Sequence, residues 1–501
     1  MNAINKPHLK NKGPAQSMTG MCFDNSYARL PGAFYKRCDP DSVANPKLIA
    51  LNRPLAVDLG MDDPDLLDDH GLLSDLFSGN RLPMGAEPIA TAFAGHQFGE
   101  FVHELGDEQT LLVGEVIDRC QQRKDIQLNG CGRTPFARSG DGRSPLAAAI
   151  REYLLSEAMH ALGVPTTRAL ALTTTGEFAS LDNPQPATVM ARVTSCHIRI
   201  GTFEYFARSQ QQGALRALAD YTIARLCPEL MTRPDPYLSL LRWAVDRQAK
   251  LVAHWVNIGF IHGEMDTDKV SLAGETSDYG ASAFLDHYDP DALFSASDLT
   301  GRYAYNNQAF AAQWNLSRLA EALVGLLHGS KARAVAEASR AVKEFRPRYE
   351  DYLLDLTRAR LGLDGAMPED RQLIRDLRQL LAQHKIDYHS FFHKLADDID
   401  GGGITAALFG SEAGRYLDWY RHWHLRLTLT GRSSEQCFQA MMAANPLVVP
   451  RNHVIERVIE RALDQDFSEF YGFLNAVRSP FEEPDDPTYC HPSEDNPALS
   501  R

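Results

Sequence analysis

The sequence predicts an α+β fold in which a β-rich lobe with one key helix precedes a mainly helical lobe. Two observations support this prediction. Short β-rich segments joined by glycine-rich connections occupy the chain from Ala94 to about Val193, and after Phe203 the apolar residues recur at helical spacing. A chain of 501 residues is also long enough to require more than one packed lobe.

Changes in residue composition and apolar spacing along the chain suggest four regions. We expect an N-terminal extension over 1–90, with a mobile tail over 1–20 and an irregular, turn-rich segment after Phe23. The β-rich lobe then covers 91–205 and the helical lobe 206–330. A helical C-terminal extension ending in a polar tail covers 331–501.

In the β-rich lobe, "TLLVGEVI" (110–117), "DIQL" (125–128), "RALALTTT" (168–175) and "ATVMARV" (187–193) are predicted strands. "LNGCGRTPFARSGDGRSP" is a glycine-rich connection suited to close approach of a ligand. The key helix follows it, with Ser144 as the expected N-cap, Pro145 at the first position, and Gly163 and Pro165 as the stop signal. Glu152 lies off the apolar stripe of this helix.

Composition and charge exclude several classes of protein. A formal net charge of -14 and a pI near 5.7 disfavour general binding to nucleic acid or to an anionic membrane. No apolar run is long enough to span a membrane, and the N-terminus lacks the apolar core of a secretion signal. Eight cysteines without paired spacing indicate reduced thiols, so we expect a cytoplasmic protein.

Residues 261–286, "IHGEMDTDKVSLAGETSDYGASAFLD", interrupt the helical half with two aspartates ten positions apart. In a kinase-like nucleotide site, one acidic residue orients or deprotonates the acceptor hydroxyl and a later Asp holds metal on the phosphates. Asp268 and Asp278 suit these two roles. Lys269 is unexpected there, because its ammonium group places a positive charge in a site that is suited to bind a metal cation.

Several long blocks carry a resemblance to a known family. They are "FDNSYARLPGAFY", "AGHQFG", "RSGDGRSPLAAAIREYLLSEAMHALGVPTTRALAL", "HIRIGTFEYFA", the stretch 261–286, "GRYAYNNQAFAAQWNLSRLAEAL" and "NPLVVPRNHVIERVIERA". The chain resembles the selenoprotein O family, also called the YdiU family. The resemblance implies a protein-kinase-like bilobal fold and transfer of AMP from ATP to Ser, Thr or Tyr hydroxyls of proteins.

The resemblance also implies roles for individual residues. The lobe over 91–205 would bind the nucleotide, and the lobe over 206–330 would carry the catalytic and metal-binding loops. Asp268 would be the base, Asp278 a ligand of Mg²⁺ or Mn²⁺, and Glu152 the helix carboxylate that faces a phosphate-binding lysine. The positions that match ATP contacts in the family are Gly106, Asp141, Gly142, Arg192 and Arg199. The nucleotide would be flipped relative to ordinary kinases, with its α-phosphate toward the acceptor.

The chain departs from the family pattern at charged positions. Asn129 stands where the family has a lysine, Glu108 and Gln109 replace a glycine and an arginine, and Lys269 replaces a metal-binding asparagine. Losing two charge-assisted contacts, each worth roughly 1.5–3 kcal/mol, would weaken ATP binding on the order of a hundredfold. Cys490 has no second cysteine nearby, which argues against redox control by the tail.

Two hypotheses account for Lys269. It takes over phosphate neutralisation from position 129 and stands in for one metal ion, or it only pairs with Glu152, Asp266 or Asp278 in a decayed site. Accordingly the chain is predicted to be an AMP transferase, a pseudoenzyme that binds nucleotide or partner proteins, or a transferase with a changed nucleotide or acceptor. The sequence leaves the acceptor proteins and the oligomeric state open.

Overall fold

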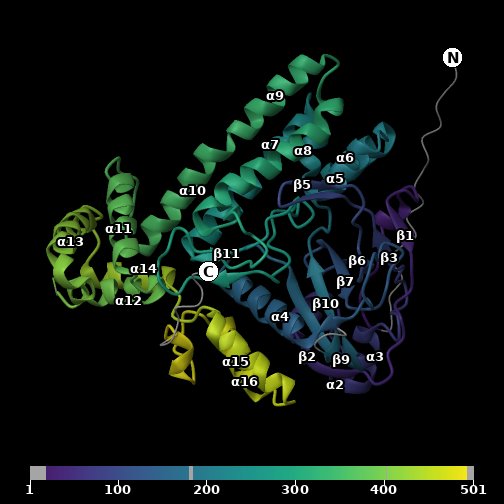
Figure 1. Cartoon of the computed structure of the whole chain (residues 1–501), viewed down its shortest axis with the longest axis horizontal. Helices are drawn as coiled ribbons and strands as arrows, with labels where there is room; N and C mark the ends of the chain where they lie inside the picture. Colours follow the sequence, from purple (N-terminus) through teal and green to yellow (C-terminus); the bar gives the residue numbers. More distant parts are fainter. Residues whose placement is uncertain (1–18, 180–183, 402, 494–501) are drawn as a thin grey trace.

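The computed structural model describes residues 19–179, 184–401 and 403–493, and has an antiparallel sheet in its N-terminal half and helices in its C-terminal half (Figure 1). The expected mobile tail over 1–20 falls almost entirely outside these residues. Within them, no helix is long and apolar enough to cross a membrane.

The main sheet has eight strands in the order β1-β3-β6-β7-β10-β9-β2, with β8 pairing with β10, and every pairing is antiparallel. Its strands are β1 (Tyr35–Arg37), β2 (Lys47–Leu51), β3 (Ile89–Thr91), β6 (Thr110–Ile117), β7 (Arg123–Asn129), β8 (Ser144–Pro145), β9 (Arg168–Ala179) and β10 (Gln185–Thr194). Two small two-stranded sheets pair β4 (Gly95–Gln97) with β5 (Glu100–Val102) and β11 (Phe260–Ile261) with β12 (Ala283–Phe284); the first is a hairpin, and a long loop joins the strands of the second.

The predicted strands after Ala94 are confirmed, but the segment after Phe23 is more regular than expected. It contributes three strands to the main sheet and three helices, α1 (Arg53–Asp58), α2 (Pro64–Asp68) and α3 (His70–Ser78). The apolar side chains of α1–α3 form a core with residues of β6, β7, β9 and β10. The segment therefore completes the β-rich half instead of wrapping it loosely.

The key helix α4 (Leu146–Ala161) packs on β9 and β10. The predicted cap is wrong by one residue: Pro145 is the N-cap, and Ser144 and Pro145 form β8. The backbone of Ser144 and Pro145 pairs with Thr188 and Ala187 of β10, and no side chain caps the helix. The predicted stop is confirmed, because Gly163 has φ +74° directly after the helix.

The helical half is built around the long helix α7 (Pro236–Asn257), which packs against α8 (Gln308–Leu327), α9 (Lys331–Lys343) and α10 (Phe345–Arg360). The apolar spacing of these segments explains the packing, since each buries one stripe in a continuous core. The other helices of this half are α5 (Ile200–Arg208), α6 (Gln212–Leu226), α11 (Asp370–His384), α12 (Tyr388–Asp397), α13 (Ala413–Thr428), α14 (Ser434–Ala444), α15 (Asn452–Leu463) and α16 (Ser468–Arg478).

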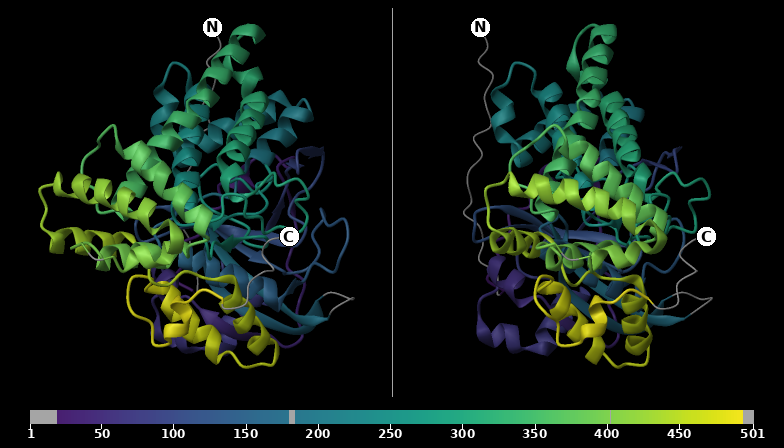
Figure 2. Two further views of the ribbon diagram at one scale, coloured as in Figure 1. Left: turned by 60° about the vertical axis from the view of Figure 1, so that its left-hand side comes forward. Right: turned by 90° about the vertical axis from the view of Figure 1, so that its left-hand side faces the viewer.

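The last two helices return to the β-rich half. Figures 1 and 2 show α15 and α16 beside α4, at the end of the molecule where the N-terminal strands and helices lie. Arg478 forms an ion pair with the buried Glu157 of α4 at 3.2 Å, and the Tyr471 hydroxyl donates to the Ile49 carbonyl. The C-terminal extension therefore supports the helix that carries Glu152. Cys490, which lies in the expected polar tail, is half-buried against this core.

Candidate functional site

A cavity of about 280 Å³ lies between the sheet and the loops of the helical half. It is lined by β6, β7 and β10, by the start of β9, by α4, and by the loop that follows β11. Seven of the nine predicted site residues line it: Gly106, Glu152, Arg192, Arg199, Asp268, Lys269 and Asp278. Asp141 and Gly142 do not line the cavity and lie in the glycine-rich loop before α4.

Asp268 is held in a tight and largely buried position. Its side chain accepts a hydrogen bond from Gln97 Nε2 at 3.3 Å, while Oδ1 is buried without a partner. A Cβ atom at Gly95 would lie 2.8 Å from Oδ1, which explains the glycine in "AGHQFG". Burial, with the nearby Asp266 carboxylate, raises the pKa of Asp268 to about 6. Asp268 therefore has the basicity of a proton acceptor near neutral pH.

Neighbouring residues hold the segment around Asp268 in place. Asp266 accepts hydrogen bonds from the Phe98 amide at 2.8 Å and from the Tyr303 hydroxyl at 2.6 Å. Thr267 accepts from the His96 amide at 2.7 Å and donates to Glu204. Because these partners come from the β4–β5 hairpin, α5 and the segment before α8, Asp268 depends on the packing of the whole helical half.

Lys269 forms two ion pairs within the site. Its ammonium hydrogen-bonds Glu264 and lies 3.3 Å from Asp278 Oδ2. Burial alone would lower the pKa of Lys269, but Asp278 and Glu264 outweigh it, and the pKa is raised. The expected pairing with Asp278 is present. Glu264 was not foreseen as a partner, although it lies five positions before Lys269 in the same loop.

Asp278 has an unusual backbone and a perturbed acidity. Its φ is +62°, in the left-handed region that residues other than glycine rarely adopt. Burial would raise its pKa, but Lys269 and His262 overcome that effect, and the pKa is lowered. The Asp278 carboxylate is thus ionised at neutral pH and already faces one cation.

Glu152 forms an ion pair with Arg192 across the cavity, with Oε1 2.9 Å from Nη1. Burial raises the pKa of Glu152, and Arg192 opposes that shift. Arg192 of β10 supplies the positive charge next to this carboxylate. Asn129 itself accepts a hydrogen bond from the Thr110 hydroxyl of the neighbouring strand at 3.2 Å.

Two further charged groups at the cavity have local partners. Arg199 precedes α5, with its guanidinium 4.3 Å from the centre of the Phe93 ring and Nη2 3.5 Å from Asp107 Oδ1. Glu108 accepts a hydrogen bond from Arg138 Nε at 2.7 Å. The negative charge introduced at position 108 is therefore matched by Arg138, a residue that sequence reasoning did not single out.

Gly106 has a structural requirement of its own. It adopts φ +67°, and a Cβ atom there would lie 2.4 Å from Cγ of Phe136. Any larger residue at this position would push the segment 105–109 away from the glycine-rich connection. This glycine therefore lets the two loops at the mouth of the cavity pack against each other.

Comparison with known proteins identifies the family. The family model described as "Protein adenylyltransferase SelO" matches residues 17–478. A relative from Rhodopseudomonas palustris (strain TIE-1), named protein nucleotidyltransferase YdiU, is 48% identical over 466 residues, which cover 92% of this chain and 94% of the relative. A relative of the same name from Rhizobium meliloti (strain 1021) is 46% identical over 482 residues, covering 95% and 98%. The chain therefore belongs to the SelO family of protein adenylyltransferases, whose relatives are named protein nucleotidyltransferases.

Proposed function

We propose that this protein transfers AMP from ATP to Ser, Thr or Tyr hydroxyls of other proteins, with Asp268 as the base. One observation carries the proposal: a single cavity contains a buried carboxylate, Asp268, with a pKa of about 6 together with Asp278, Glu152, Arg192 and Arg199. The family relatives' names support nucleotidyl transfer. The kinase-like bilobal arrangement is part of the proposal, and the antiparallel sheet followed by helices supports it.

In the proposed reaction, the ionised Asp268 accepts the proton of the acceptor hydroxyl as its oxygen attacks the α-phosphorus. The bond from the α-phosphorus to the bridging oxygen breaks, and pyrophosphate leaves. Arg192 and Arg199 suit the leaving phosphates, because one guanidinium group can donate two parallel hydrogen bonds to phosphate oxygens. Gly106, Asp141 and Gly142 are proposed as further contacts of the nucleotide.

The donor set fits one Mg²⁺ or Mn²⁺ ion carried with the nucleotide. In the part of the chain that the structure describes, no three His, Cys, Asp or Glu side chains converge on a metal position. Mg²⁺ commonly takes only one or two carboxylates from the protein and completes its shell with phosphate oxygens and water. Asp278 would hold this ion, which would neutralise charge on the phosphates. The Lys269 ammonium takes the place of a second cation.

A pseudoenzyme that binds nucleotide or partner proteins without transfer is the second candidate. Lys269 favours it, because this ammonium already neutralises the proposed metal ligand Asp278. Incubation of the protein and candidate acceptors with α-labelled and with γ-labelled ATP tests both functions. Label retained on protein only from the α position supports AMP transfer, and label only from the γ position indicates a kinase. No retained label, with ATP and Mg²⁺ still raising the melting temperature, indicates the pseudoenzyme.

A further inference from the structure

A groove of about 450 Å³ runs between α8 and α9, which lie side by side in the helical half (Figure 1). Phe310, Trp314 and Val324 of α8 line one side of it, and Val335 and Val342 of α9 line the other. Phe310 is 63% exposed and Val335 is 44% exposed. Large apolar side chains that remain exposed together on a folded protein indicate a contact surface. We call this surface the α8–α9 groove.

One end of the α8–α9 groove adjoins the residues that hold Asp268. The ring of Trp314, which lines the groove, lies 5.2 Å from the ring of His96 in the β4–β5 hairpin. The next residue of the hairpin, Gln97, donates to Asp268 at 3.3 Å and lines the cavity. Asn315 of α8 also donates to a carbonyl of the loop that leads to Asp268, at 2.7 Å. The groove and the cavity therefore share the β4–β5 hairpin as a common border.

Two arginines at this border have no carboxylate partner. The Arg302 guanidinium lies 4.4 Å from the centre of the Trp314 ring, and the Arg208 guanidinium lies 4.9 Å from the centre of the Phe101 ring of β5. In the part of the chain that the structure describes, neither group forms an ion pair, although β5 itself carries Glu100. Both guanidinium groups are therefore available to carboxylates of another molecule.

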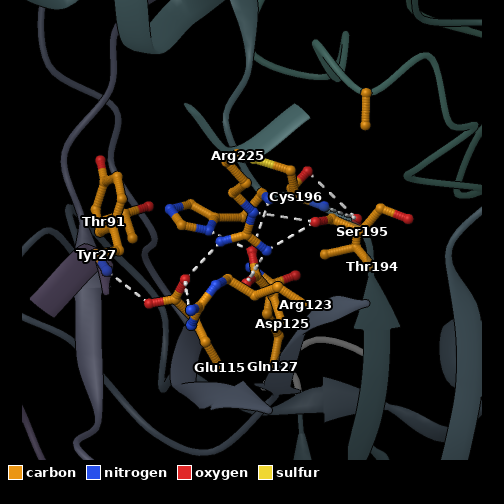
Figure 3. A network of polar contacts seen from close by, with 12 residues as sticks. Tyr27, Thr91, Glu115, Arg123, Asp125, Gln127, Thr194, Ser195, Cys196 and Arg225 are labelled. Atoms are coloured by element: carbon orange, nitrogen blue, oxygen red, sulfur yellow. Dashed lines mark hydrogen bonds and ion pairs between the residues drawn. The ribbon is translucent and has the colours of Figure 1, made fainter. Parts of the chain in front are cut away.

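The arginines around the cavity itself are in the opposite state. Arg192 pairs with Glu152, and Arg225 donates to both Asp125 and Glu115 in the buried network of Figure 3. The whole chain has a formal net charge of -14, so most of its surface repels an acidic partner. Two unpaired guanidinium groups at one border therefore determine where acidic residues of a partner can bind.

The dimensions of the α8–α9 groove match a polypeptide segment. The stretch of α8 from Phe310 to Val324 is roughly 21 Å long at 1.5 Å per residue, which suits the apolar face of a helix of about four turns. The arginines lie at the end of the groove nearest to Asp268. A segment bound in this way places its acidic residues near the proposed base and its apolar residues farther along α8.

We propose that the α8–α9 groove docks the acceptor protein through a segment that has acidic residues next to the modified hydroxyl and apolar residues beyond them. This inference rests on the proposed function and names the kind of acceptor that the site takes. The arginines at the border contribute selectivity for the acidic residues, and the groove contributes affinity through burial of apolar surface.

The test selects binders, without ATP, from a displayed library of random peptides of roughly 20 residues with a central Ser, Thr or Tyr, a length that spans the groove and its border. The bound pool should be enriched in Asp and Glu near the hydroxyl and in apolar residues on one side of it. An enriched peptide should bind Phe310→Ser and Arg302→Ala about tenfold more weakly than the unmodified protein. Added salt should weaken binding to the unmodified protein more than binding to Arg302→Ala, a difference that a folding defect would not produce.

Phe178→Ser of β9 and Arg421→Ala of α13 are the matched controls, because both side chains are exposed and neither lines the groove. Both should bind the peptide as the unmodified protein does. A pool without either enrichment, or equal binding by folded Phe310→Ser, overturns the inference. A protein that sediments as a dimer, and as a monomer after Phe310→Ser, places a second copy in the groove and overturns it too.

The same peptides separate this inference from the proposed function. Enriched peptides that bind the groove but take no label from α-labelled ATP refute the proposed function and leave the docking surface standing. Label on proteins at the same rate for the unmodified chain and for Phe310→Ser, with no enrichment in the bound pool, refutes the docking inference and leaves AMP transfer standing.

Discussion

Replacing Lys269 by asparagine should make ATP binding depend more strongly on Mg²⁺. The ammonium is 3.3 Å from Asp278 Oδ2, and it occupies the side of that carboxylate that a cation would approach. Two unit charges about 4 Å apart interact by roughly 4 kcal/mol near a protein surface and roughly 1 kcal/mol in water. Because the Asp278 side chain is 43% exposed, screening brings the expected value to about 1–2 kcal/mol.

This energy sets the size of the expected effect. Without the ammonium, Asp278 regains its attraction for a divalent ion, and the Mg²⁺ concentration that half-saturates ATP binding should fall about tenfold. The free energy of unfolding without ligand should fall by about 1–2 kcal/mol, since Glu264 loses its ion-pair partner and keeps only the hydrogen bond from the Ser295 hydroxyl. Both charges are present at pH 7, because the pKa of Lys269 is raised and that of Asp278 is lowered.

Calorimetric titration of ATP at a series of Mg²⁺ concentrations measures the effect, with the exposed Lys343→Asn of α9 as control. The first hypothesis for Lys269, that it takes over phosphate neutralisation from position 129, is tested by the double variant Asn129→Lys with Lys269→Asn. This variant restores the pattern of the resembled family at both positions. Unchanged ATP affinity and unchanged metal dependence in the double variant would refute the idea that Lys269 replaces a lysine at position 129 and a metal ion. Lys269 would then be a structural ion pair only.

Three other predictions follow from the contacts of the site. AMP transfer should rise with pH through about 6 as Asp268 ionises, and Asp268→Asn should abolish it. The same variant should raise the free energy of unfolding at pH 7 by about 3 kcal/mol, because a carboxyl whose pKa is raised on folding destabilises the protein as pH increases from 4 to 6. Equal stability of both proteins at pH 7 in urea unfolding would contradict the assigned pKa. Gly95→Ala should displace Asp268 and reduce transfer at least about tenfold with ATP affinity retained, as its Cβ would lie 2.8 Å from Oδ1; retained transfer would argue against a fixed position for the base. Arg138→Ala should weaken ATP binding about tenfold by leaving Glu108 unneutralised, and Glu108→Ala in the same chain should restore it; additive losses in the double variant would show that the two side chains act independently.

The sequence predicted the long elements well and the short ones poorly. Apolar residues recur regularly enough in residues 110–117 and in the helices around α7 to predict these elements, and the structure confirms them. Strands β1 and β2 have only three and five residues, so they show no period, and their place is set by pairing with β3 and β9. The predicted cap of α4 was wrong for the same reason: Ser144 and Pro145 form a short strand through pairing with β10, which is distant in the sequence.

At the candidate site, the sequence indicated which residues gather but not which of them pair. Seven of the motif positions line one cavity. The pairing of Arg138 with Glu108 depends instead on how two loops meet in space, and that of Glu264 with Lys269 depends on how one loop is folded. Trp314 stood within the block "GRYAYNNQAFAAQWNLSRLAEAL" and drew no attention, since nothing in a sequence shows that Arg302 of the same block lies over its ring. A groove between two helices becomes visible only in three dimensions.

The charge changes at this site are better explained as a coupled set than as independent losses. Glu108 is neutralised by Arg138, Glu152 by Arg192, and Asp278 by Lys269, so three of the carboxylates at the cavity have a cation in contact, whereas Asp268 accepts only from the neutral amide of Gln97. Yet the same pairing also reduces what each cation offers to a nucleotide, since an arginine or lysine bound to a carboxylate is partly neutralised before the ligand arrives. Under the proposed function, a bound ATP would compete with the carboxylates for these cations, and Lys269, held by two carboxylates, is the cation whose release would change the site most.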